Sequence, residues 1–71
     1  MSDKQREAME LRTIQVSTKA ALKSVSSDEE IERVKVTSTE LLARLESEVI
    51  RDGADPEIIA ALEAARRELW D

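Results

Sequence analysis

Residues 51–62 read Arg-Asp-Gly-Ala-Asp-Pro-Glu-Ile-Ile-Ala-Ala-Leu, a stretch that contains the stop of one helix and the start of another. Gly53 is the only glycine in the chain, and glycine is preferred just past a helix end because it adopts positive φ without steric cost. Asp55 followed by Pro56 is typical of an N-cap and of the first helical position. Because the link is so short, the two helices must be antiparallel neighbours.

Apolar residues recur at steps of three and four along the chain, which predicts helices over residues 3–25, 28–52 and 56–70. Ser2 with Gln5, and Ser27 with Glu30, have the capping-box spacing at the first two starts. The short links then predict an all-α domain over residues 1–71, an up-down-up antiparallel three-helix bundle. The expected inner faces are Leu11, Ile14, Thr18, Ala21, Leu22 and Val25; Ile31, Val34, Ser38, Leu41, Leu42, Leu45 and Val49; and Ile58, Ala61, Leu62, Ala65 and Leu69.

Two segments allow a different interpretation. Near residues 12–18 and 31–37 the chain carries alternating β-branched residues, which favours strands and gives an α+β alternative with two C-terminal helices. Two short strands make a poor sheet, since three or more are normally needed. The helical spacing also continues through both segments, so we expect helices there.

The residues missing from the chain exclude most kinds of chemistry. There is no His and no Cys, so the commonest general base, thiol catalysis, disulfides and Cys/His zinc sites are all excluded. We therefore expect no enzyme, no catalytic residue, no metal site and no cofactor. Acidic clusters such as residues 29–32 are interpreted as solvated helix faces.

The net charge of −5, from 11 basic and 16 acidic residues, argues against a nucleic-acid partner, which needs clustered Lys and Arg. The sequence has no Gly-rich phosphate loop and no aromatic platform, so we expect neither a small-molecule substrate nor a bound base. The longest apolar run, residues 58–62, is far shorter than the roughly 20 residues that span a bilayer. We expect a soluble protein without a membrane partner or targeting signal, cytoplasmic if expressed in cells.

A second, weaker apolar stripe on the outer side of the two long helices is the candidate interface. A helix that buries one face in a bundle is expected to be polar on the other. The stripe comprises Met9, Thr13 and Val16 on the first helix and Val36, Ala43 and Ile50 on the second. These residues predict a protein-interaction module or scaffold that binds a protein partner.

A second copy of the chain is the alternative partner. The third helix is shorter than the others, so it should leave one end of the bundle uncovered, and self-association would bury that end together with the second apolar stripe. The residues expected there are Leu22, Val25, Ile31 and Val34. Thr18 and Ser38 interrupt the core stripes, and we expect their hydroxyls to bond back to the preceding turn rather than across the bundle.

Three features of the sequence occur together. They are strong N-terminal capping patterns at residues 27–30 and 55–57, a single glycine, and a run of strong helix formers at residues 61–69. The chain resembles computationally designed helical mini-proteins, which use these capping and propensity rules. The resemblance implies a bundle made as a scaffold. Residues 13–18 and 34–39 depart from it, because such designs rarely put β-branched and hydroxyl residues into helices.

Overall fold

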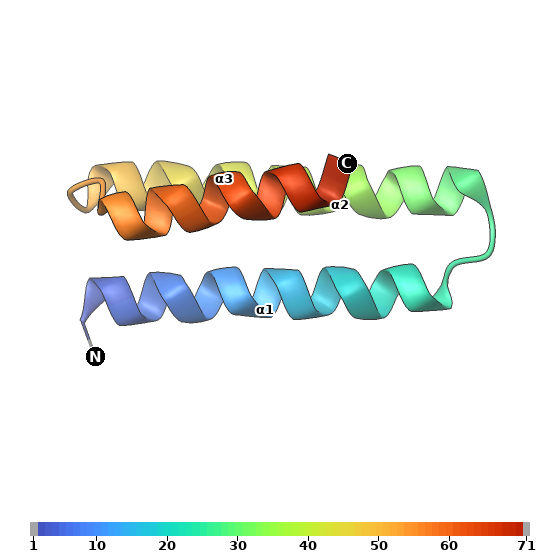
Figure 1. Ribbon diagram of the computed structural model, residues 1–71, viewed down its shortest axis with the longest axis horizontal. Helices are drawn as coiled ribbons and strands as arrows, with labels where there is room; N and C mark the ends of the chain where they lie inside the picture. The colour runs from blue at the N-terminus through green and yellow to red at the C-terminus, as the bar shows by residue number, and fades with distance from the viewer. Residues whose placement is uncertain (1, 71) are drawn as a thin grey trace.

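The computed structural model describes residues 2–70, which form three α-helices: α1 (Asp3–Ser24), α2 (Asp28–Arg51) and α3 (Pro56–Trp70). Successive helices run in opposite directions along one long axis, which is horizontal in Figure 1. The prediction of an all-α three-helix bundle is confirmed. The strand alternative is wrong, because residues 12–18 lie inside α1 and residues 31–37 lie inside α2.

The helices begin and end at or next to the residues that the capping pattern predicts. Ser2 and Gln5 form a complete capping box, in which the Ser2 Oγ accepts from the Gln5 N–H and the Gln5 Oε1 accepts from the Ser2 N–H. At α2 only half of the predicted box forms, because Ser27 accepts from the Glu30 N–H at 3.2 Å. α1 ends one residue before the predicted Val25, which is already extended with ψ of 149°.

The turn between α2 and α3 is a Schellman motif. The Ala54 N–H donates to the Val49 carbonyl at 2.8 Å and the Gly53 N–H to the Ile50 carbonyl at 3.3 Å, the pattern that satisfies the last helical carbonyls. Gly53 has a φ of 121°, as expected, but Ala54 is also left-handed with a φ of 55°. Asp55 Oδ1 then accepts from the Glu57 N–H at 2.9 Å and caps α3.

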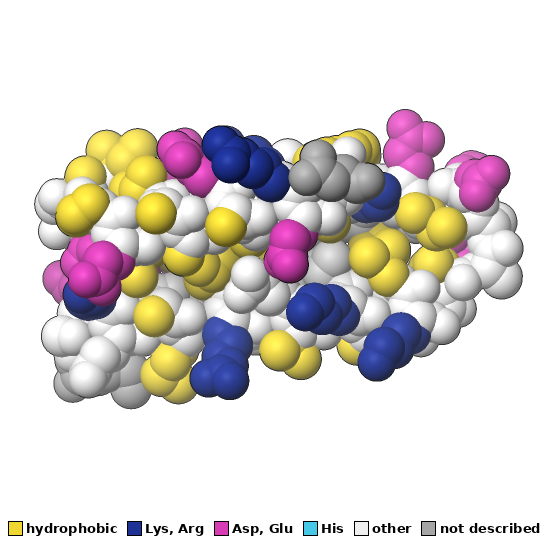
Figure 2. Space-filling model, viewed as in Figure 1, with side chains coloured by type: hydrophobic (Ala, Val, Ile, Leu, Met, Phe, Trp, Pro, Cys, Tyr) yellow, Lys and Arg dark blue, Asp and Glu magenta, His cyan; other side chains and the backbone are white. Residues whose placement is uncertain are grey.

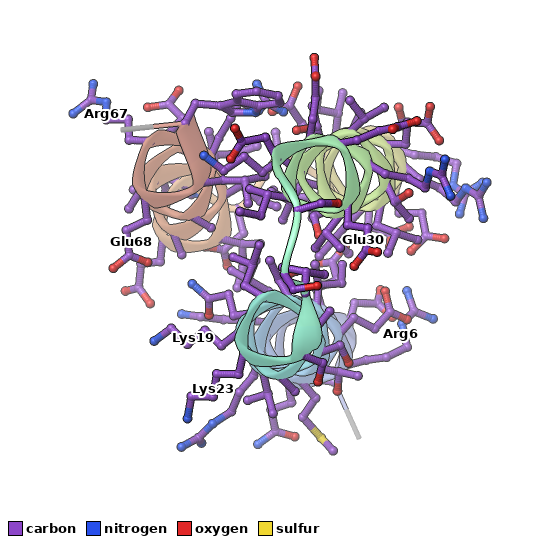
Figure 3. The ribbon with its side chains drawn as sticks, turned by 90° about the vertical axis from the view of Figure 1, so that its right-hand side faces the viewer. Arg6, Lys19, Lys23, Glu30, Arg67 and Glu68 are labelled. Atoms are coloured by element: carbon purple, nitrogen blue, oxygen red, sulfur yellow. The ribbon has the colours of Figure 1, made fainter. Side chains whose placement is uncertain are left out.

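The three helices occupy the corners of a triangle when seen end-on, with α1 below, α2 at upper right and α3 at upper left (Figure 3). Their apolar stripes meet in the centre. The buried core consists of Leu11, Leu42, Leu45, Val49, Ile58, Leu62, Ala65 and Leu69. The predicted inner faces are therefore largely confirmed, and every helix contributes to the core.

The structure differs from the predicted inner faces at two places. The periodicity predicts Leu41 in the core, but it is 39% exposed, because it sits about 100° around α2 from Leu42 and faces the flank of α1 that α3 does not cover. The Thr18 hydroxyl does bond back to the Ile14 carbonyl at 2.7 Å. It also lies 2.6 Å from the buried Ser38 hydroxyl, so the bond across the bundle forms as well.

The end of the bundle near the α1–α2 link lacks a third helix. α3 has 15 residues and α2 has 24, which leaves about 13 Å of the α1–α2 hairpin uncovered at 1.5 Å per residue. The four residues predicted for this tip are only half-buried, namely Leu22, Val25, Ile31 and Val34. Figure 2 shows hydrophobic side chains exposed at this right-hand end of the molecule.

Candidate interaction groove

An apolar depression of about 490 Å³ lies between α1 and α2 and contains no residue of α3. Ile14 and the buried Leu45 belong to its floor, while Met9 is 58% exposed and Leu41 is 39% exposed. Thr13 turns its hydroxyl away by donating to the Met9 carbonyl at 2.9 Å, so it adds no free donor. The full lining is Arg6, Met9, Glu10, Thr13, Ile14, Leu41, Arg44, Leu45 and Glu48.

A second depression of about 310 Å³ continues the first one toward the tip. The two share Ile14 and Leu41, and the second extends to Ala21 and Val34. From Arg6 to Ala21 the pair spans about 22 Å along α1 at 1.5 Å per residue. We call the two depressions together the α1–α2 groove. In the end-on view Arg6 points outward on this side of the bundle, away from α3 (Figure 3).

The rim of the groove carries charges of both signs. α1 contributes Arg6 and Glu10, and α2 contributes Arg44 and Glu48. Arg6 is held by Asp52 at 3.0 Å. Among residues 2–70, the other three rim side chains form no ion pair. They are available to an incoming chain without breaking an existing contact.

The predicted interface residues on α1 fall along one strip of that helix. Met9 and Thr13 line the groove. Val16 is 61% exposed and lies outside the lining, just beyond the outer edge of the groove. The α1 half of the predicted interface is therefore a continuous surface that leads into the groove.

The predicted residues on α2 occupy a different surface. Val36, Ala43 and Ile50 are all exposed, and their spacing of seven places them on one outer strip of α2. Val36 lies about 140° around the helix from Leu41 at 100° per residue. The structure therefore does not bring the two halves of the predicted interface together.

Trp70 is the last residue of α3, and its indole ring packs against α2. Its Nε1–H donates to the Thr39 hydroxyl at 2.8 Å, and the Lys35 ammonium is 5.7 Å from the ring centroid. The indole remains 49% exposed. These contacts anchor the end of α3 against α2.

Two features of this region do not follow from the sequence pattern. The pattern places Leu41 in the core, because it does not tell the centre of an apolar face from its edge. Glu7 is 2% exposed, although the sequence predicts no buried charge. The sequence does contain an indication that Glu7 is buried, because Glu7 lies one helical turn before Leu11 on the same apolar stripe.

Glu7 is a buried carboxyl between α1 and the α2–α3 turn. Within residues 2–70 its Oε2 has no hydrogen-bond partner. Burial raises the pKa of Glu7, and a hydrogen bond and charge repulsion with Asp52 raise it further, while the nearby Arg6 lowers it. The carboxyl is thus held in surroundings that favour its protonated form.

Ion pairs fasten α1 to the start of α3 at the same end. The Lys4 Nζ lies 2.7 Å from Glu57 Oε2 and 3.9 Å from Asp55 Oδ2. The hydrogen bond with Glu57 raises the pKa of Lys4, and the charges of Asp55 and Glu57 act in the same direction. These contacts are exposed, so they position the helix end more than they stabilise it.

Two other kinds of feature, a metal site and a membrane-spanning helix, are absent from the part of the chain that the structure describes. Residues 2–70 contain no group of three or more acidic side chains arranged to hold a metal ion. None of the three described helices is long and apolar enough to cross a membrane. Comparisons with protein-family models, with curated proteins and with solved structures find no match. The resemblance to designed bundles therefore stays an interpretation of the sequence.

Proposed function

We propose that this protein is a non-catalytic protein-interaction module whose α1–α2 groove receives a partner chain. The observation that carries the proposal is the exposure of Leu41 and Met9 over an apolar floor. Exposed apolar patches rimmed by polar residues are typical of interaction sites. The charged rim formed by Glu10, Arg44 and Glu48 has the composition expected around such a patch.

A polypeptide fits this groove better than a small molecule does. Small-molecule pockets enclose most of the ligand and place a few convergent polar groups inside. Here the charges of Glu10 and Arg44 lie on opposite rims, and the floor between them is apolar. A third depression, between α1, α2 and α3, holds about 100 Å³, which is below the roughly 300 Å³ expected of a ligand pocket.

Selection from a displayed peptide library tests the proposal, because it samples many partner sequences at once. Peptides enriched on the wild-type protein are expected to lose binding to the Leu41→Arg variant and to keep binding to Ile50→Arg. Ile50 is 57% exposed and lies outside the groove, so it is a matched control for the added charge. Enriched peptides that bind both variants equally would contradict the proposal, as would a failure to enrich any peptide.

Self-association is the second candidate function, favoured by the half-buried tip. The tip is about 13 Å long and about 20 Å wide across two helices, or roughly 260 Å². A stable interface buries about 800 Å² per partner, so the tip alone is too small and further apolar surface would have to join it. Sedimentation across a concentration series tests this candidate, and a concentration-independent monomer would exclude it.

A further inference from the structure

We infer that the α1–α2 groove accepts one amphipathic helix of about 15 residues from a different polypeptide, which packs as a fourth helix on the hairpin. The inference rests on the proposed function and specifies the guest. A helix in a groove is a common mode of peptide recognition. The length and apolar spacing of the guest follow from α3, and its charges follow from the rim.

α3 serves as an internal template for the guest. It is a 15-residue helix that covers the other side of the same hairpin, with an expected length of about 22 Å. It does so with Ile58, Leu62, Ala65 and Leu69, all of them buried, at steps of four, three and four. The α1–α2 groove has the same length and an apolar floor, so the same spacing of side chains on a guest would fill it.

The rim determines which charges the guest must carry. Glu10 on α1 favours a cation on one flank of the guest. On the other flank, Arg44 favours an anion, and Glu48, one turn further along α2, favours a second cation. Because these three side chains make no ion pair among residues 2–70, new pairs would form without the loss of old ones.

A second copy of this chain satisfies these requirements poorly. Its most exposed apolar stripe on α2, Val36, Ala43 and Ile50, repeats only every seven residues. It therefore offers one side chain per two turns, where the α3 template has one per turn. Its positions one turn from Val36 and Ala43 are the charged Glu32 and Glu40 and the polar Thr39 and Ser47, which do not match an apolar floor.

Three designs of a fluorescein-labelled synthetic 15-residue peptide test the inference by fluorescence anisotropy with the full-length protein. The first two have the apolar spacing of α3, with leucine at the four anchor positions. The first carries the charges complementary to Glu10, Arg44 and Glu48, the second has the three signs reversed, and the third replaces two anchors with serine. Each charge pattern is made in both sequence orders, and the tighter order of each is compared.

The complementary peptide is expected to bind about 60-fold more tightly than the sign-reversed one, since each of the three exposed pairs contributes a factor of about two when attractive and costs a similar factor when repulsive. The serine peptide is expected not to bind. Leu41→Arg should weaken the complementary peptide at least tenfold, while Ile50→Arg should leave its affinity within twofold. If circular dichroism indicates that Leu41→Arg does not fold, Met9→Arg, at a more exposed position of the same groove, takes its place.

The possible outcomes separate this inference from the proposed function. Equal binding of the complementary and sign-reversed peptides, with both lost in Leu41→Arg, would overturn the predicted charge pattern and leave the groove as an interface. Display peptides that depend on Leu41 but bind in a non-helical form would overturn the helical guest. A dimer of the protein that Leu41→Arg converts to monomer would identify a second copy as the occupant and overturn the inference.

Discussion

Replacement of Glu7 by glutamine should stabilise the protein at neutral pH. Glu7 is 2% exposed and its Oε2 lacks a partner among the described residues. A buried polar group left unsatisfied costs about 1–3 kcal/mol. Glutamine has the same shape, removes the repulsion with Asp52, and brings an N–H that can donate to that carboxylate. We expect the free energy of unfolding to rise by about 1–2 kcal/mol, a fraction of that penalty.

The pH dependence of this gain follows from the direction of the pKa shift. The pKa of Glu7 is raised in the folded protein, mainly by burial, so the folded state binds the proton more tightly than the unfolded chain does. Stability therefore falls as pH rises from the ordinary glutamate value of 4.5 through the raised pKa. Glutamine does not titrate, so its advantage should be small near pH 4 and complete above the raised pKa.

Urea unfolding of both proteins at about pH 4 and about pH 7 measures the effect, and contributions from carboxylates that do not interact with Glu7 cancel in the difference. Glu10→Gln is the matched control, because Glu10 is an exposed glutamate of the same helix and its replacement should change stability by less than about 0.5 kcal/mol. The reasoning is refuted if Glu7→Gln destabilises the protein at pH 7, or if its effect is the same at both pH values.

Three further substitutions test the structure elsewhere. Ala54→Gly should raise the free energy of unfolding by about 0.5–1 kcal/mol, because Ala54 has a φ of 55° and a left-handed alanine costs more than the glycine entropy; a loss of stability in urea unfolding would contradict this. Ser38→Ala should cost about 1 kcal/mol by removing the bond to Thr18, and an unchanged thermal midpoint would mean that the bond contributes nothing. The double variant Val36→Glu with Ile50→Glu should keep its helical circular dichroism, since both residues are exposed, and unfolding would place them in the core.

The local signals in the sequence predicted the helices well. Ser2, Ser27 and Asp55 cap the three helices, and Gly53 follows the end of α2. Each of these features depends on hydrogen bonds within one turn of the chain, so the sequence around it contains all the participants. The β-branched segments at residues 12–18 and 31–37 are helical because the apolar stripes that continue through them pack against the other helices, and packing outweighs propensity.

The candidate site could be predicted only in part, for a reason that the two halves of the predicted interface illustrate. Met9 and Thr13 line the groove, but Val36, Ala43 and Ile50 lie on another side of α2. Periodicity places residues on the same strip of one helix. It does not specify how that helix is rotated against its neighbours, so strips on two helices cannot be joined into one surface from the sequence.

The sequence by itself determined where the helices begin and end, that they alternate in direction, and that the third is too short to cover the tip. Those properties depend on caps, link lengths and residue counts, which are local. Only the tertiary structure decided that Leu41 faces solvent, that Glu7 is buried, and that an apolar groove stays open between α1 and α2. These depend on which flank of the hairpin α3 covers, and that choice is made by side chains that lie far apart in the chain.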